Sequence, residues 1–202
     1  MKEYFYDKLL NIHTRGSQTL SAGSRHHHPY QPTPYSALEK LFEVYQIKNS
    51  DCIVDFGSGK GRLGFYIYYF FNATVTGVEM NTTLHKKALR NRMRYLSQTM
   101  EGTDKVHFHC CYAEEYRVTP FDNRFYFFNP FSVDVFQKVI QNIECSVKQH
   151  KRDIDLILYY GSDEYVDFLR KDTAFDLIHD INLSKLFNGD DYDRFLVYRL
   201  EA

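Results

Sequence analysis

The chain has 202 residues, a length that suits one compact domain with a sizeable hydrophobic core. Its formal net charge of -1 gives no overall attraction to nucleic acid or to an anionic membrane, so nucleic acid stays open as a partner without being indicated. No apolar run is long enough to span a bilayer, and the first residues do not form a secretory signal. We therefore expect a cytoplasmic protein with no membrane partner.

Residues 1–34 are expected to form the least regular part of the chain. Glycines and serines interrupt every period between residues 16 and 24, and the segment 29–35 then carries three prolines and two tyrosines. Prolines stiffen a segment and fix its direction, and Pro34 suits the first turn of a helix. We interpret residues 1–34 as a segment that can close over a site as a lid, mobile without ligand, and residues 35–202 as the main domain.

No metal site is expected. The three adjacent histidines at 26–28 point in different directions from one segment, and no cysteine or acid stands at a ligand spacing from them. The four cysteines show neither a C-x-x-C spacing nor a disulfide framework, so we expect buried, reduced thiols. They are Cys52, Cys110, Cys111 and Cys145.

A glycine-rich turn follows the first expected strand. Residues 52–56 are typical of a short buried strand, residues 57–61 of a tight turn, and the apolar period from Leu63 of a helix. Glycines fit this turn because a Cβ would block both the tight backbone angles and the approach of a ligand. A second apolar run, residues 73–78, leads to Glu79, twenty positions after the middle glycine. An acid in this place can accept hydrogen bonds from both ribose hydroxyls of an adenosine.

The rest of the chain alternates between helices and strands. A helix over residues 82–98 carries a basic strip that could touch nucleic-acid phosphates, but we interpret it as a solvated helix face. The strip consists of Lys86, Lys87, Arg90 and Arg94. Further strands are expected at residues 106–109, 124–128, 154–160, 175–183 and 195–200, with no helix between the last two. This order predicts an α/β fold with a mostly parallel sheet and one antiparallel strand.

The pattern around the glycine turn resembles the first motif of the class I S-adenosylmethionine-dependent methyltransferases. Glycines stand at 57, 59 and 61, and Asp55 stands two residues before the first of them. A dinucleotide-binding fingerprint instead needs its third glycine at position 62, where this chain has arginine. The resemblance covers residues 35–202. It implies a Rossmann-like seven-stranded sheet with helices on both faces, and S-adenosyl-L-methionine as cofactor.

The resemblance also implies a set of cofactor-binding residues. Asp55 would lie beneath the methionine end of the cofactor, Glu79 would hold the ribose, and the turn would admit the cofactor at Gly57, Ser58, Gly59 and Gly61. The family usually has Gly-Asp-Ala at the adenine, where its acid reaches the amino group, but this chain has Cys111-Tyr112-Ala113. Tyr112 and Ala113 are therefore assigned to the adenine by position. The backbone at Ala113 or the carboxylate of Glu114 would replace the missing acid.

Asn129, Pro130 and Phe131 follow the aromatic strand 124–128. They resemble the fourth motif of amine-directed methyltransferases, commonly Asn-Pro-Pro-aromatic or Asp-Pro-Pro-aromatic. There the Asn side chain and the next carbonyl accept hydrogen bonds from a planar amine, and the aromatic ring stacks on the group to be methylated. The match is partial because this chain has a single proline, and a purely structural interpretation makes Asn129 a helix cap. These three residues are the catalytic candidates, and Asn129 is also assigned to the cofactor site.

Together the motifs predict an S-adenosylmethionine-dependent methyltransferase that acts on a nitrogen of an unidentified acceptor: a protein side chain, an RNA base or a small molecule. Two alternatives stay open. One is a catalytically silent protein of the same fold that acts as a binding or scaffold subunit. The other is an NAD-dependent oxidoreductase on a similar sheet. Neither the methylated atom nor the oligomeric state follows from the sequence.

Overall fold

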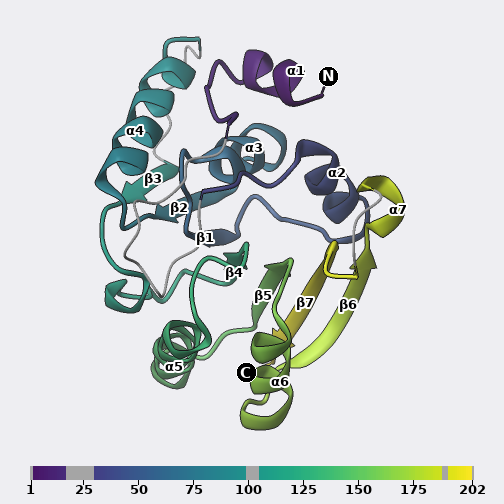
Figure 1. Ribbon diagram of the computed structural model, residues 1–202. Coiled ribbons are helices and arrows are strands. Elements are labelled where there is room, and N and C mark those ends of the chain that lie inside the picture. The colour runs from purple at the N-terminus through teal and green to yellow at the C-terminus, as the bar shows by residue number, and fades with distance from the viewer. Residues whose placement is uncertain (1, 17–29, 99–104, 188–190, 202) are drawn as a thin grey trace.

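Seven strands form one twisted sheet at the centre of the protein (Figure 1). The computed structural model describes residues 2–16, 30–98, 105–187 and 191–201. The histidines at 26–28 lie outside the described residues. The strands are β1 (Cys52–Phe56), β2 (Thr74–Val78), β3 (Val106–His109), β4 (Arg124–Phe127), β5 (Ile154–Tyr159), β6 (Asp176–Asn182) and β7 (Arg194–Leu200).

The strand order is β3-β2-β1-β4-β5-β7-β6. All neighbouring pairs from β3 to β5 are parallel, and β7 runs antiparallel to both β5 and β6. The predicted sheet with one antiparallel strand is thereby confirmed. The chain leaves β1 toward β2 on one side and returns to β4 on the other, which makes the carboxyl ends of β1 and β4 the switch point of the sheet. Open α/β sheets bind their ligands at such points.

Helices cover both faces of the sheet (Figure 1). One core is formed with α2 (Tyr35–Val44), α3 (Arg62–Phe71) and α4 (Thr82–Leu96). The other core is formed with α5 (Val133–Gln149) and α6 (Asp163–Asp172). Successive side chains of a strand enter opposite cores, and the central strands are therefore buried on both faces. This double burial explains why β1, β4 and β5 consist almost wholly of apolar or aromatic residues.

The N-terminal segment contains a helix that the sequence analysis did not predict. Residues Lys2–Leu9 form α1, so the expectation of irregular structure is wrong there. The buried carboxylate of Asp7 ties this helix to later parts of the chain. It accepts hydrogen bonds from the backbone N–H of Thr14 (2.9 Å), from the Thr14 hydroxyl (2.6 Å) and from the Tyr35 hydroxyl (2.9 Å). Two short elements, η1 (Ala113–Glu115) and α7 (Ser184–Phe187), are also absent from the prediction.

The cysteines do not have the burial that we expected. All four are free thiols, but Cys110 and Cys145 are exposed, and Cys52 and Cys111 are only partly buried. Cys110 directly follows the edge strand β3, which has a neighbour on one side alone, and Cys145 lies on the outer face of α5. Within the described part of the chain, no helix is both long enough and apolar enough to cross a bilayer.

Candidate functional site

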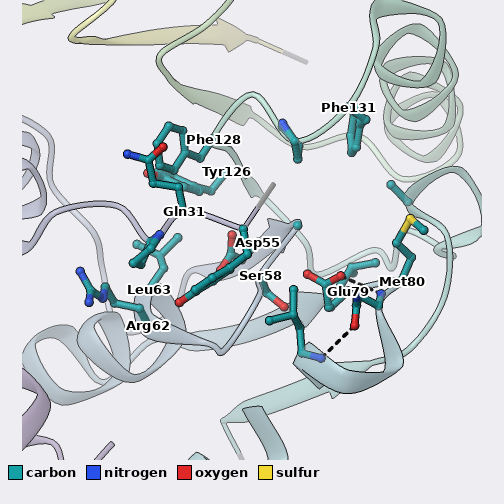
Figure 2. A pocket seen from close by; sticks show the side chains of 18 of the residues that line it. Gln31, Asp55, Ser58, Arg62, Leu63, Glu79, Met80, Tyr126, Phe128 and Phe131 are labelled. Atoms are coloured by element: carbon teal, nitrogen blue, oxygen red, sulfur yellow. Dashed lines mark hydrogen bonds between the residues drawn. The ribbon is translucent and has the colours of Figure 1, made fainter. Parts of the chain in front are cut away.

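A pocket opens at the carboxyl ends of β1, β2 and β4, at the switch point of the sheet. Figure 2 shows Asp55, Ser58 and Glu79 on one side of this pocket, with Tyr126, Phe128 and Phe131 across from them. The N-terminal segment closes part of the pocket through Tyr30, Gln31, Pro32 and Thr33. The site therefore combines the three strand ends that the sequence indicated with a wall supplied by the N-terminal segment.

Most of the predicted site residues meet in this pocket. Its lining includes Asp55, Gly57, Ser58, Glu79, Ala113, Pro130 and Phe131. It does not include Gly59, Gly61, Tyr112 or Asn129. The side chain of Tyr112 is half exposed to solvent, so its substitution for the usual acid does not fill the pocket. Glu114, the alternative acid, has a buried Oε2 without a partner among the described residues, yet it does not line the pocket.

The three glycines of the turn all have a left-handed backbone, with φ of 79° at Gly57, 57° at Gly59 and 84° at Gly61. A Cβ at Gly57 would lie 2.7 Å from Cβ of Pro130, and one at Gly59 would lie 2.1 Å from Cε2 of Tyr30. A Cβ at Gly61 would collide with the ring of Phe108 at 2.5 Å. In this structure, protein atoms fill the space above the glycines. The turn thus needs glycine for its backbone, as expected, and also for packing against other parts of the protein, a second reason that the sequence analysis did not give.

Glu79 is held in place by the backbone around it. Its Oε2 accepts the N–H of Gly59 at 2.9 Å, and its Oε1 accepts the N–H of Asn81 at 2.7 Å. The side chain is buried, and burial raises the pKa of its carboxyl, while the two backbone hydrogen bonds lower it. Each carboxylate oxygen still has a lone pair for a second donor. Glu79 therefore links the second strand to the glycine turn and can also face a ligand with two hydroxyls.

Asp55 is the other buried acid of the pocket. Burial, reinforced by the nearby charge of Glu79, raises the pKa of its carboxyl from 3.8 to about 7. Such a shift marks a carboxylate that lacks a compensating positive charge, and perturbed groups of this kind concentrate at functional sites. The hydroxyl of Ser58 is also buried and has no hydrogen-bond partner among the described residues. Two polar groups of the pocket are thus prepared for a ligand, and one of them favours a cation.

The turn after β4 has an unusual backbone at Asn129, whose φ is 38°. Asparagine is one of the few residues other than glycine that adopt left-handed angles readily. The backbone of this turn is therefore a structural reason for an asparagine at position 129. The following residues, Pro130 and Phe131, turn into the pocket. Helix α5 begins after Ser132, so Asn129 is not its cap.

Several lining residues were missed from the sequence. Met80 and Asn81 follow Glu79 directly, and Tyr126 and Phe128 stand at the end of β4. Their position at strand ends was a usable signal, because parallel strands end at one edge of a sheet. Thr33 had no such signal: it enters the site because its hydroxyl shares a 2.7 Å hydrogen bond with the hydroxyl of Tyr126. No three His, Cys, Asp or Glu side chains of the described residues gather as a metal site.

Comparisons with known proteins agree with this geometry. Residues 34–121 match the family model described as a methyltransferase domain. A 66-residue stretch is 33% identical to a protein-lysine N-methyltransferase from Saccharolobus islandicus (strain REY15A), covering 32% of this chain and 41% of that protein. The chain thus spans less than half the length of this curated relative.

Solved structures align over most of the chain. An RNA methyltransferase from Salinibacter ruber in complex with S-adenosyl-L-homocysteine has a TM-score of 0.50 at 17% identity, over 84% of this chain and 92% of that one. The geranyl diphosphate C-methyltransferase from Streptomyces coelicolor A3(2), also with S-adenosyl-L-homocysteine, has a TM-score of 0.56 at 12% identity, over 83% of this chain and 78% of that one. The chain has the class I methyltransferase fold. At these sequence identities, the similarity to the solved structures establishes the fold and not the activity.

Proposed function

We propose that the chain is an S-adenosylmethionine-dependent methyltransferase that acts on a nitrogen of its acceptor. The observation that carries the proposal is the pair of buried acids, Asp55 and Glu79, at the switch point of a methyltransferase sheet and beside a turn of left-handed glycines. The family match over residues 34–121 and the S-adenosylhomocysteine bound by structural neighbours support the same cofactor.

The polar atoms of the pocket fit this cofactor. Glu79 can accept two ribose hydroxyls with the lone pairs that its backbone hydrogen bonds leave free. Ser58 offers a buried hydroxyl without a partner among the described residues. Asp55 would pair with the ammonium of the methionine end, which supplies the positive charge that its raised pKa shows to be missing.

The cofactor supplies a methyl group that is already activated on a sulfonium, so the protein mainly provides position and orientation. Pro130 lines the pocket, and its carbonyl would accept one N–H of the acceptor. The amide oxygen of Asn129, which lies just outside the lining, would accept a second N–H and direct the acceptor's lone pair at the methyl group. Phe131 would pack against the acceptor. An amine held in this way needs only weak help with proton transfer, which fits a site in which no separate general base is assigned.

The lysine-directed relative makes a lysine side chain of a protein the first acceptor to test. Labelled S-adenosylmethionine offered with fractions of a cell lysate would show whether label enters protein, RNA or small molecules.

Calorimetric titration of the chain tests the proposal directly. We expect binding of S-adenosylhomocysteine and no binding of NAD. Binding of NAD alone would favour an oxidoreductase instead. If neither ligand binds, the interpretation as a scaffold protein of this fold gains support and the proposed activity is wrong.

Asp55 should make cofactor binding depend on pH. Because its carboxyl has a pKa of about 7, it is largely protonated at pH 6 and largely ionised at pH 8, and only the ionised form attracts the cofactor ammonium. Affinity for S-adenosylhomocysteine should therefore rise between pH 6 and pH 8. The variant Asp55→Asn should bind more weakly at pH 8 and lose this rise. A wild-type affinity that stays flat over this range, together with an unchanged affinity of Asp55→Asn at pH 8, would exclude the ion pair.

The same shift has an opposite effect on stability. A carboxyl whose pKa is raised by folding stabilises the protein fully at acid pH, and this contribution is lost as the pH rises through the folded-state pKa of about 7. Asp55→Asn removes this loss. Without cofactor, we expect the thermal midpoint of Asp55→Asn to exceed that of the wild type at pH 8. The same thermal scan is recorded for both proteins at pH 6 and at pH 8.

A further inference from the structure

Two cations, Lys60 and Arg62, lie within or directly after the glycine turn, and both are buried, with 8% and 3% of their surface exposed. Lysine and arginine are rarely so buried unless their donors are satisfied. Neither residue is assigned to the cofactor above, although Arg62 lines the pocket and its buried Nη2 has no hydrogen-bond partner among the described residues. Their partners therefore indicate what these two positions contribute.

The ammonium of Lys60 binds one backbone segment near the N-terminus. Its Nζ donates to the carbonyls of Arg15 (2.7 Å), Gly16 (3.2 Å) and Thr14 (3.4 Å), which uses all three of its donors. The same ammonium lies 4.7 Å from the ring centroid of Tyr30, a cation–π contact. One lysine of the turn thus holds residues 14–16 and also touches an aromatic wall of the pocket.

Arg62 binds both the residues before the undescribed part of the N-terminal segment and the residues after it. Its Nε donates to the hydroxyl of Thr14 at 2.8 Å, and its Nη1 donates to the carbonyl of Thr33 at 3.0 Å and to the carboxylate of Glu3. The guanidinium lies 4.2 Å from the ring centroid of Tyr35. Arg62 therefore joins α1, residues 14–16 and residues 30–35 to the first turn of α3.

These contacts position a wall of the pocket. We call residues 14–16 and 30–35 the N-terminal cover. Within it, the hydroxyl of Tyr30 donates to the carbonyl of Thr14 at 2.8 Å, so the segment that Lys60 holds also fixes the tyrosine. The ring of Tyr30 then lies directly on Gly59, where it lines the pocket together with Gln31 and Thr33.

We propose that Lys60 and Arg62 are positioning residues of the cofactor site, which hold the N-terminal cover so that Tyr30, Gln31 and Thr33 complete the pocket. This inference rests on the proposed function. The glycine turn then has two tasks: its glycines permit the close approach of Tyr30 and Pro130, and the two cations of the same turn bind the cover. The pocket is built jointly by the matched domain and by residues that precede position 34.

Lys60→Met removes the ammonium but keeps an unbranched apolar side chain. We expect the dissociation constant of S-adenosylhomocysteine, measured calorimetrically, to increase at least tenfold. Lys60→Arg, which keeps a charge and several donors, should lose much less. Lys86→Met on the exposed face of α4 is the matched control and should bind like the wild type. Unfolding in urea, measured on each variant, shows whether the protein remains folded.

A double-mutant cycle separates positioning from general stability. If Lys60 acts through the cover, Lys60→Met should add little to the loss of affinity caused by Tyr30→Ala, because the wall is already missing. Hydrogen exchange over residues 10–16 and 30–35 should be faster in Lys60→Met than in the wild type. Should Lys60→Met fail to fold, Tyr30→Phe replaces it in the binding and hydrogen-exchange measurements, because it deletes only the hydroxyl that binds Thr14, and it should weaken binding by a smaller factor.

Three results would overturn the inference while the proposed function stands: a folded Lys60→Met or Tyr30→Phe that binds S-adenosylhomocysteine like the wild type, losses that add in the double variant, or unchanged exchange of the cover. If instead the wild type does not bind S-adenosylhomocysteine, the proposed function fails and the inference fails with it.

Discussion

Glu79→Ala is expected to weaken the binding of S-adenosylhomocysteine at least tenfold. Two ribose hydroxyls lose a charged acceptor, and hydrogen bonds to charged groups contribute about 1.5–3 kcal/mol each before water compensates. The structure adds a second cause, because the backbone N–H groups of Gly59 and Asn81 lose the same carboxylate and the glycine turn loosens. Calorimetric titration on protein shown to be folded measures the effect.

Two further variants test this assignment. Glu79→Gln keeps the shape and one acceptor oxygen but presents an amide donor to the other backbone N–H, so an intermediate affinity is expected. Glu164→Ala removes an exposed acid in the first turn of α6 and should change nothing. If Glu79→Ala keeps the wild-type affinity, its assignment to the ribose is wrong.

Asn129→Ala should slow methyl transfer by about 100-fold or more, because a displacement of the acceptor by about one ångström can cost that much. Cofactor affinity should change far less than in Glu79→Ala. Rates are measured at saturating S-adenosylmethionine with the acceptor that the lysate screen identifies.

The left-handed backbone at Asn129 calls for a matched control, Asn129→Gly, which adopts φ of 38° without strain and also lacks the amide. If the amide orients the acceptor, both variants should be slow. If the glycine variant transfers methyl at the wild-type rate, the residue serves the backbone turn alone. Poor cofactor binding with normal transfer at saturation would instead place Asn129 in the cofactor pocket.

The sheet could be predicted because the amino-acid composition of its strands reflects their burial. Residues 52–56 are apolar apart from Asp55, and the aromatic run at 124–128 has no polar face, as double burial requires. Helix α1 gave no comparable signal: Tyr4 and Phe5 are exposed, and its anchor is Asp7, a charged residue buried against Thr14 and Tyr35. Contacts between residues far apart in the chain leave no periodic pattern.

The site was predictable to the extent that it follows strand ends. Glu79 was found in this way, Asp55 and Pro130 were found through the resemblance of their motifs, and all three line the pocket. The N-terminal segment was expected near the site, but its mobility stays a prediction, and the atoms that connect Tyr30 to the glycine turn could not be inferred. The hydrogen bonds from the Lys60 ammonium to three backbone carbonyls depend on tertiary structure, which the spacing of residues in the sequence does not predict.

The place of β7 in the sheet affects the order in which the protein can assemble during synthesis. β7 follows β6 in the chain but lies between β5 and β6, so β6 has no hydrogen-bonded neighbour until β7 has been made. Strands β1 to β5 can pair as they leave the ribosome, whereas residues 176–182 must wait as an unpaired, aggregation-prone edge. Premature termination before residue 194 would therefore remove two strands from the sheet, although it deletes the sequence of only one.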